Sequence, residues 1–145
     1  MADELDFAVD LDSIRDRLSS LAYFTAVESL QEGTLNIENL IGIPPLAFVS
    51  TVSETAEKNK LVGAWSQRVT PTISVLFCIP AESASGSAGD ELEAARKAII
   101  RILLGWTPTG AEDPLSYSRF LLRASRDGLI WGEVLMTTTY HLRLA

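Results

Sequence analysis

The order of apolar and polar positions along the chain predicts two amphipathic helices. In the first, apolar residues recur at helical spacing and Asp10 is placed to cap the opening turn. Its apolar stripe comprises Leu11, Ile14, Leu18 and Leu21. The second helix begins at Asp90, with Glu93 three residues later as in a capping box, and Gly105 is placed to end it. Its stripe comprises Leu92, Ala95, Ile99, Ile102 and Leu103.

Runs rich in β-branched and aromatic residues predict about four substantial strands. They cover residues 46–54, 65–79, 117–124 and 129–144, and residues 24–30 are a candidate for a further brief strand. Pro71 predicts an edge position or a bulge in the second run, because proline cannot donate to a strand ladder. Asp127-Gly128 is a strong hairpin signal, and Gly132 predicts a bend or a bulge in the last run.

Together these elements predict the α+β class. We expect a two-layer sandwich, with a mostly antiparallel sheet of about four strands and the two helices on one face. The chain has 145 residues, which suits a single domain over residues 1–145. A fold of this size buries about 70% of the surface that its unfolded chain exposes, so one hydrophobic core is sufficient.

Two polar segments between the elements are the candidates for partner contacts. Residues 55–64 carry Glu57, Lys58, Asn59 and Lys60, and are long enough to project beyond the sheet as the tip of a hairpin. Residues 81–89 are almost entirely small residues, so we expect this loop to be mobile in the isolated protein. Each segment is either a solvated connection or a contact with a partner.

Composition and charge exclude several classes of protein. The net charge of −7 argues against a duplex-DNA binder, because lysine and arginine supply most non-specific affinity for phosphates. Cys78 is the sole cysteine, so no intrachain disulfide can form. The acidic N-terminus lacks the pattern of a signal peptide, and no apolar run approaches the roughly 20 residues of a membrane span. We expect a soluble protein that is made in the cytoplasm.

The search for catalytic, cofactor and metal sites gives no candidate. His141 is the sole histidine and lies in a strand pattern without a nucleophile motif, so an ordinary polar partner is favoured over catalysis. Cys78 stands in an apolar strand with no nearby cation to lower its pKa. The acidic clusters lack the loop of a calcium site, and the three tryptophans favour core or rim positions. No enzyme class is indicated.

Four passages resemble the tail-terminator family of long-tailed bacteriophages, over about two-thirds of the chain. They are Gln67-Arg68-Val69-Thr70, the helix from Asp90 with its exit Gly105-Trp106-Thr107-Pro108, the strand start Pro114-Leu115-Ser116-Tyr117, and Trp131 with Thr139-Tyr140-His141-Leu142-Arg143. Their order and spacing make the match specific. The chain departs from the family at Ser118-Arg119, where a glycine pair is frequent.

The resemblance implies a structural virion protein at the head-proximal end of the tail. Its expected partners are further copies of itself in a homohexameric ring, the tail-tube protein and a head-completion or neck protein. DNA is expected only in transit through the lumen, and no membrane is involved. Loop residues are the expected partner interface: Glu57, Lys58, Asn59, Lys60, Trp65, Ser83, Ser85 and Ser87.

Two alternatives remain open at this stage. Another head-tail neck or head-completion protein shares the small size, acidity and lack of catalytic groups, and differs in binding the head portal rather than the tube end. A small-ligand-binding protein is the second alternative, and requires a pocket with convergent polar groups.

Overall fold

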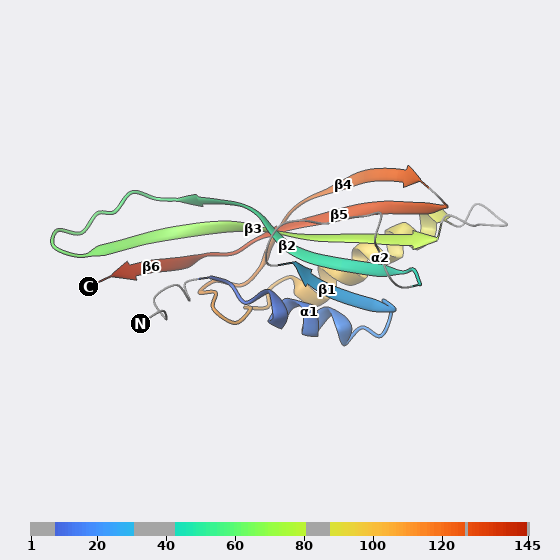
Figure 1. Cartoon of the computed structure of the whole chain (residues 1–145), viewed down its shortest axis with the longest axis horizontal. Coiled ribbons are helices and arrows are strands. Elements are labelled where there is room, and N and C mark those ends of the chain that lie inside the picture. Colours follow the sequence, from blue (N-terminus) through green and yellow to red (C-terminus); the bar gives the residue numbers. More distant parts are fainter. Residues whose placement is uncertain (1–7, 31–42, 81–87, 127, 145) are drawn as a thin grey trace.

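The computed structural model describes residues 8–30, 43–80, 88–126 and 128–144. The elements in this part of the chain are, in order, α1 (Leu11–Ser19), β1 (Ala26–Leu30), β2 (Leu46–Ala56), β3 (Trp65–Pro80), α2 (Ala88–Leu103), β4 (Ser116–Arg126), β5 (Leu129–Thr137) and β6 (Tyr140–Leu144). All six strands belong to one open sheet (Figure 1). The predicted α+β class is therefore confirmed, with more strands than the four or so expected.

The sheet has the strand order β1-β2-β3-β5-β4, and β6 pairs with β3 beyond the end of β5. Every pairing is antiparallel except that of β1 with β2. Two differences account for the larger number of strands. The brief strand candidate at residues 24–30 forms β1, and the run 129–144 forms two strands instead of one.

The run 129–144 is interrupted at Thr138 and Thr139 rather than at Gly132. In the register of β3, Thr72 faces Thr137 and Val69 faces Tyr140, so Pro71 lies where the partner changes from β5 to β6. Proline has no N–H for the ladder. The Thr139 carbonyl instead accepts a hydrogen bond from the Glu112 N–H at 2.8 Å. Pro71 is thus in a central strand and not at an edge, whereas the other expectation, a bulge, is met beside it, where β2 shifts register between Thr51 and Ser53 opposite Ile73 and Thr72.

A bulge lies beside Gly132, in the paired strand β4 between Leu122 and Ala124, and Gly132 itself provides space in the core. A Cβ atom at this position would lie 2.9 Å from the rings of both Phe77 and Phe120. These two rings lie 6.4 Å apart, between the sheet and α2. The missing side chain therefore lets two aromatic rings pack against the backbone of β5.

Both helices cover the same face of the sheet. α1 packs on β1 and β2, α2 packs on β3 and β5, and the helices contact each other. The core on this face includes Ile14, Leu18, Ile99, Leu103, Val49, Val75, Phe77 and Met136, all nearly inaccessible to solvent. Neither helix in the described part of the chain is long and apolar enough to cross a membrane.

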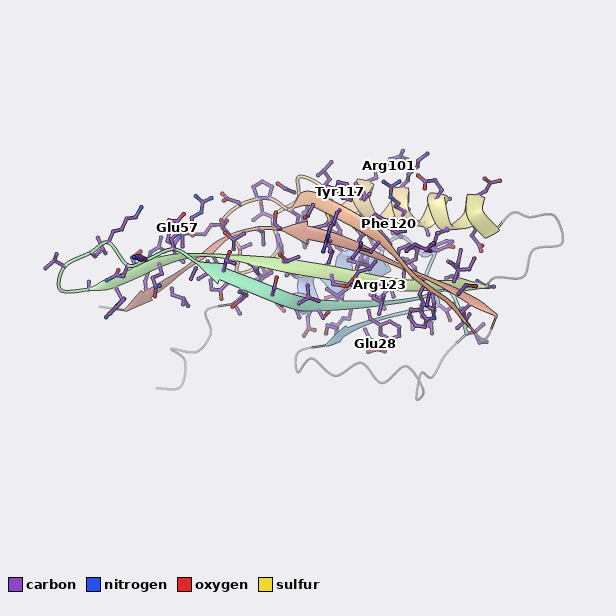
Figure 2. The ribbon with its side chains drawn as sticks, turned by 90° about the horizontal axis from the view of Figure 1, so that it is seen from above. Glu28, Glu57, Arg101, Tyr117, Phe120 and Arg123 are labelled. Carbon is purple, nitrogen blue, oxygen red and sulfur yellow. The ribbon has the colours of Figure 1, made fainter. Side chains whose placement is uncertain are left out.

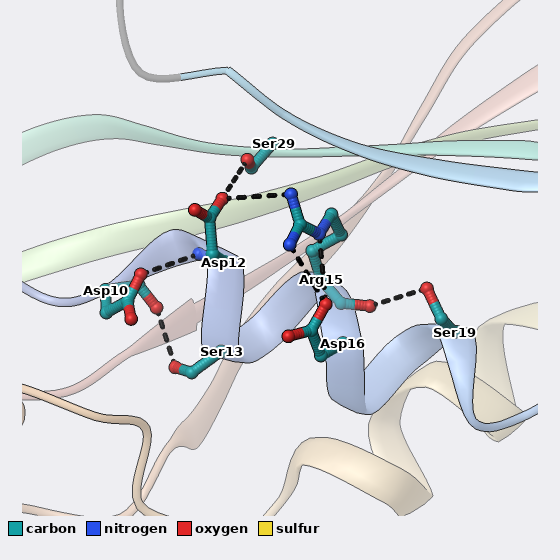
Figure 3. Close-up of polar contacts among 7 residues, drawn as sticks. All are labelled: Asp10, Asp12, Ser13, Arg15, Asp16, Ser19 and Ser29. Atoms are coloured by element: carbon teal, nitrogen blue, oxygen red, sulfur yellow. Dashed lines mark hydrogen bonds and ion pairs between the residues drawn. The ribbon is translucent and has the colours of Figure 1, made fainter.

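The expected cap of α1 and the expected end of α2 are confirmed, whereas Asp90 and Glu93 lie inside α2 and Glu93 pairs with Arg96 instead of forming a capping box. Asp10 has an extended backbone and accepts from the Asp12 N–H at 3.0 Å, so it caps α1 as predicted. Asp12 in turn accepts from the Ser29 hydroxyl at 2.5 Å, which fastens α1 to β1 (Figure 3). α2 begins two residues before the expected Asp90, and Gly105 follows its end with a φ of 79°.

The sheet continues well beyond the helices. We call the part under α1 and α2 the body, and the projecting part, residues 52–70 and 140–144, the arm (Figure 1). The arm consists of the end of β2, the beginning of β3 and all of β6. The expected two-layer sandwich therefore describes the body alone, because no described helix covers the arm.

The face of the sheet away from the helices carries its own apolar cluster. Leu46, Phe48, Cys78 and Trp131 form it, and the Phe48 and Trp131 rings stack 6.3 Å apart. Beside them lies Glu133, which is buried, accepts a hydrogen bond from Ser74 and pairs with Arg123 at 2.5 Å. We call this side of the sheet the far face.

Candidate assembly surface

The arm exposes apolar side chains that the body does not cover. Leu61 and Val62 lie at its tip, Trp65 at the start of β3 and Val52 on β2. Val62 is fully exposed, and 56% of Trp65 is accessible. Exposed apolar groups gathered on a projecting element mark an interaction surface more often than scattered single residues do. The arm is therefore the first candidate for a contact with a partner protein.

The tip of the arm is closed by Asn59. Its side-chain amide donates to the carbonyls of Leu61 and Ala64 at 3.2 and 3.1 Å, and its Oδ1 accepts from the Ser66 N–H at 2.8 Å. The Gln67 side chain adds a hydrogen bond to the Glu57 carbonyl. These contacts join the two sides of the turn within a single chain.

A polar cluster fastens the base of the arm to the loop before β4. Asp113 accepts from the Thr139 hydroxyl at 2.5 Å and pairs with Arg68 at 3.0 Å. Its neighbour Glu112 bonds His141 and lies 3.3 Å from Arg143. We call this set of six residues the arm clamp, because it joins β3, β6 and residues 112–113.

The arm clamp favours the charged carboxylates. The hydrogen bond with His141 lowers the pKa of Glu112, and the positive charge of Arg143 acts in the same direction. The hydrogen bond from Thr139, assisted by the charge of Arg68, lowers the pKa of Asp113. His141 thus has the ordinary polar partner that its strand position predicts.

Tyr140 joins the arm to the core. Its ring is buried, and its hydroxyl donates to Glu54 on β2 at 2.9 Å. Burial, together with the Glu54 carboxylate, raises the pKa of Tyr140 to about 12. The phenol therefore stays a neutral donor, which ties β6 to β2 across the intervening β3.

The structure brings together five of the eight interface residues predicted from the sequence. Glu57, Lys58 and Lys60 are exposed at the arm tip, with Trp65 beside them, whereas the Asn59 side chain turns inward to close the hairpin. The remaining three, Ser83, Ser85 and Ser87, lie outside the described residues. Their expected role as a contact is untested.

The open edge formed by β4 was not predicted from the sequence. This strand pairs only with β5 in the described structure, and its outer edge exposes Tyr117, Leu122, Arg119 and Arg123. Register shifts occur between Tyr117 and Arg119 and between Leu122 and Ala124. Ser118, where the chain departs from the family pattern, is the extra residue of the first of these bulges. The arginines that recur along this strand were the signal in the sequence that could have indicated an exposed edge.

The groups with potential chemistry are engaged or buried. The Cys78 thiol lies in the apolar cluster of the far face, where burial raises its pKa. Among the described residues, no group of three or more histidine, cysteine, aspartate or glutamate side chains could hold a metal ion. The features that stand out are accordingly surfaces, the arm and the sheet edges.

Comparison with known proteins agrees with a structural role. A chain from a solved structure described as the virion of a native gene transfer agent particle has the same fold, with a TM-score of 0.52 and 16% identity. The match covers 92% of this chain and 95% of that one. None of the curated proteins compared with the chain matches it. The family model described as phage tail terminator protein matches residues 6–144, so the chain belongs to this family of structural virion proteins.

Proposed function

We propose that the protein caps the head-proximal end of a phage tail tube as a homohexameric ring. In this position it stops polymerisation of the tube protein and offers its other side to a head-completion protein. The family match over residues 6–144 carries the proposal. The fold, with a packed body and a projecting arm, offers the arm and the sheet edges as contact surfaces.

The arm supports a role in contacting the tube or a neighbouring subunit. Its tip presents Leu61 and Val62 to solvent, and the Asn59 side chain forms hydrogen bonds across the turn that carries them. A contact surface that is already folded loses little conformational entropy on binding. The arm clamp fixes the base in the same way, so the tip is held at a defined distance from the body.

The charge of the chain suits a ring around a DNA channel. A net charge of −7 per subunit repels the phosphate backbone, so DNA can pass through the lumen without adhering to it. A solved ring with a strongly basic, DNA-contacting lumen would contradict this part of the proposal.

The decisive experiment adds the purified protein to the cognate tail-tube protein during polymerisation. We expect tubes of arrested length with a ring at one end, seen by electron microscopy, and a ring mass of six subunits by native mass spectrometry. Tubes of unchanged length and bare ends would contradict capping. Binding to the head portal in place of the tube would identify a neck or head-completion protein instead.

A further inference from the structure

We propose that neighbouring copies of this chain join edge to edge, with β4 of one copy against β1 of the next. The inference rests on the proposed ring and assigns the surfaces that close it. Its partner is a second copy of this chain, and the join continues the sheet from one subunit into the other.

The two outermost strands of the body make this join possible. β1 ends the sheet on one side and β4 ends it on the other, and neither pairs with a second strand in the described part of the molecule (Figure 1). An unpaired edge offers backbone N–H and carbonyl groups to another strand. Because each copy has two different edges, the contact is head-to-tail and can close into a ring.

Strand directions are compatible with antiparallel pairing across the join. β1 runs parallel to β2, and each step from β2 through β3 and β5 to β4 reverses direction. β4 therefore runs opposite to β1. In a sheet that continues with the same face outward, β4 and the next copy's β1 meet as antiparallel neighbours.

The two edges carry opposite charge on the same face. Glu28 on β1 lies directly opposite Phe48 and therefore points to the far face. On β4, Arg119 lies opposite Leu135, two residues from Glu133, and Arg123 contacts Glu133, so both arginines are on the far face as well. Continuing the sheet brings the acidic group of one copy beside the basic groups of the next.

These charged residues have capacity for a new partner. Glu28 and Arg119 are exposed, and neither is in an ion pair or side-chain hydrogen bond with another described residue, although the charge of Glu28 acts on Arg15 of α1. Arg123 keeps its contact with Glu133 and is 52% exposed on its side chain. Opposite charges that meet across an interface fix its register and suppress wrong pairings.

The other side of β4 adds apolar area to the join. Tyr117 and Phe120 lie toward α2 (Figure 2). Arg96 of that helix contacts both of them. Leu122, opposite Gly132, is 65% exposed. The edge thus offers the apolar side chain of Leu122 on the helix face and the charge of Arg119 on the far face, next to Arg123 with its Glu133 partner. Apolar groups beside charged ones are typical of a specific interface.

Edge arginines have a second known role that the test must separate from this one. Charged side chains on an edge strand also protect it from uncontrolled pairing. In that case reversing the charge of Arg119 leaves assembly unchanged or increases association. If the residue pairs with Glu28 of the next copy, the same reversal weakens the ring.

The test uses charge reversal in the full chain. We expect Glu28→Lys and Arg119→Glu each to raise the protomer concentration needed for half-assembly at least tenfold, measured by light scattering after gel filtration. An equimolar mixture of the two variants should restore even-numbered rings in which the variants alternate. In such a ring every join places one acidic and one basic side chain together, whereas a join between two copies of the same variant places like charges together. Circular dichroism verifies that each variant is folded.

Matched controls reverse charge elsewhere on the surface. Glu91→Lys and Arg101→Glu change exposed residues of α2 that lie on neither edge, and should assemble as the wild type does. Intact rings in both edge variants, or a mixture that stays monomeric, would overturn the edge-to-edge join while leaving capping in place. A wild-type protein that never forms a ring, alone or on tubes, would overturn the proposed function and this inference together.

Discussion

At the scale of single residues, the core of the body leaves no room for added volume at Gly132. In Gly132→Ala the new methyl group would lie 2.9 Å from the rings of Phe77 and Phe120. We expect the free energy of unfolding to fall by about 1–3 kcal/mol, because overpacking a filled core destabilises a protein by this amount. Urea denaturation measures it. Gly89→Ala is the control, because a Cβ atom added at this position in the first turn of α2 meets nothing within 4 Å. This variant should be at least as stable as the wild type, since alanine favours a helix more than glycine does.

Asn59 is the residue on which the shape of the arm tip depends. Asn59→Ala removes the bonds to Leu61, Ala64 and Ser66. Because the turn is exposed, we expect global stability to fall by no more than about 1 kcal/mol. Hydrogen exchange of the Ser66 amide should nevertheless become faster, whereas amides in the body stay protected. Equal exchange at Ser66 in both proteins would show that the strands alone define the turn.

At the scale of elements, the arm clamp makes stability depend on pH. The pKa of Glu112 is lower in the folded chain than in the unfolded chain, so the unfolded chain binds the proton more tightly. The stabilisation is complete above the unfolded value of about 4.3 and is lost as pH falls through the lower folded pKa. Asp113 has a shift in the same direction.

We therefore expect Glu112→Gln to be less stable than the wild type at pH 7 and to lose less stability on acidification. Urea denaturation at several values between about pH 6 and pH 3 gives the two curves. Glu91→Gln removes an exposed carboxylate of α2, outside the arm clamp, and serves as the control. Parallel curves for the wild type and Glu112→Gln would show that the clamp does not contribute to folding.

The elements that could be predicted from the sequence are those specified by local spacing. Apolar residues three and four apart identified both helices, and Asp10 and Gly105 marked ends that the structure confirms. The break between β5 and β6 was missed, because it depends on Pro71 in another strand and on Glu112 bonding Thr139. The residue pattern of the run 129–144 alone shows neither the proline in the neighbouring strand nor this hydrogen bond.

The same distinction applies to the candidate surface. Residues 55–64 were expected to project as a hairpin tip, because a polar segment between two strand patterns indicates one, and they do. The inward turn of Asn59 and the open edge of β4 were not foreseen. An edge is defined by strand order, which for β4 follows from long-range pairing with β5 and not from its own residues.

At the scale of the whole molecule, exposed residues of the arm can be changed without altering the core, so their effect on assembly can be measured apart from their effect on folding. Val62 is fully exposed at the tip and belongs to no core cluster. Val62→Asp should therefore leave the free energy of unfolding within about 0.5 kcal/mol of the wild type. If the tip enters an apolar contact with the tube or a neighbour, a charge there should raise the concentration needed to arrest tube growth at least tenfold.

Ile43→Asp provides the matched control, because it places the same charge on an exposed β-branched residue just before β2, at the opposite end of that strand from the arm. We expect this variant to arrest tubes at the wild-type concentration. Tube lengths counted in electron micrographs over a dilution series compare the three proteins. Since Val62 contributes no core packing, weaker capping by Val62→Asp alone would assign the contact to the arm tip, whereas capping equal to the wild type would leave the sheet edges and the body as the contact surfaces.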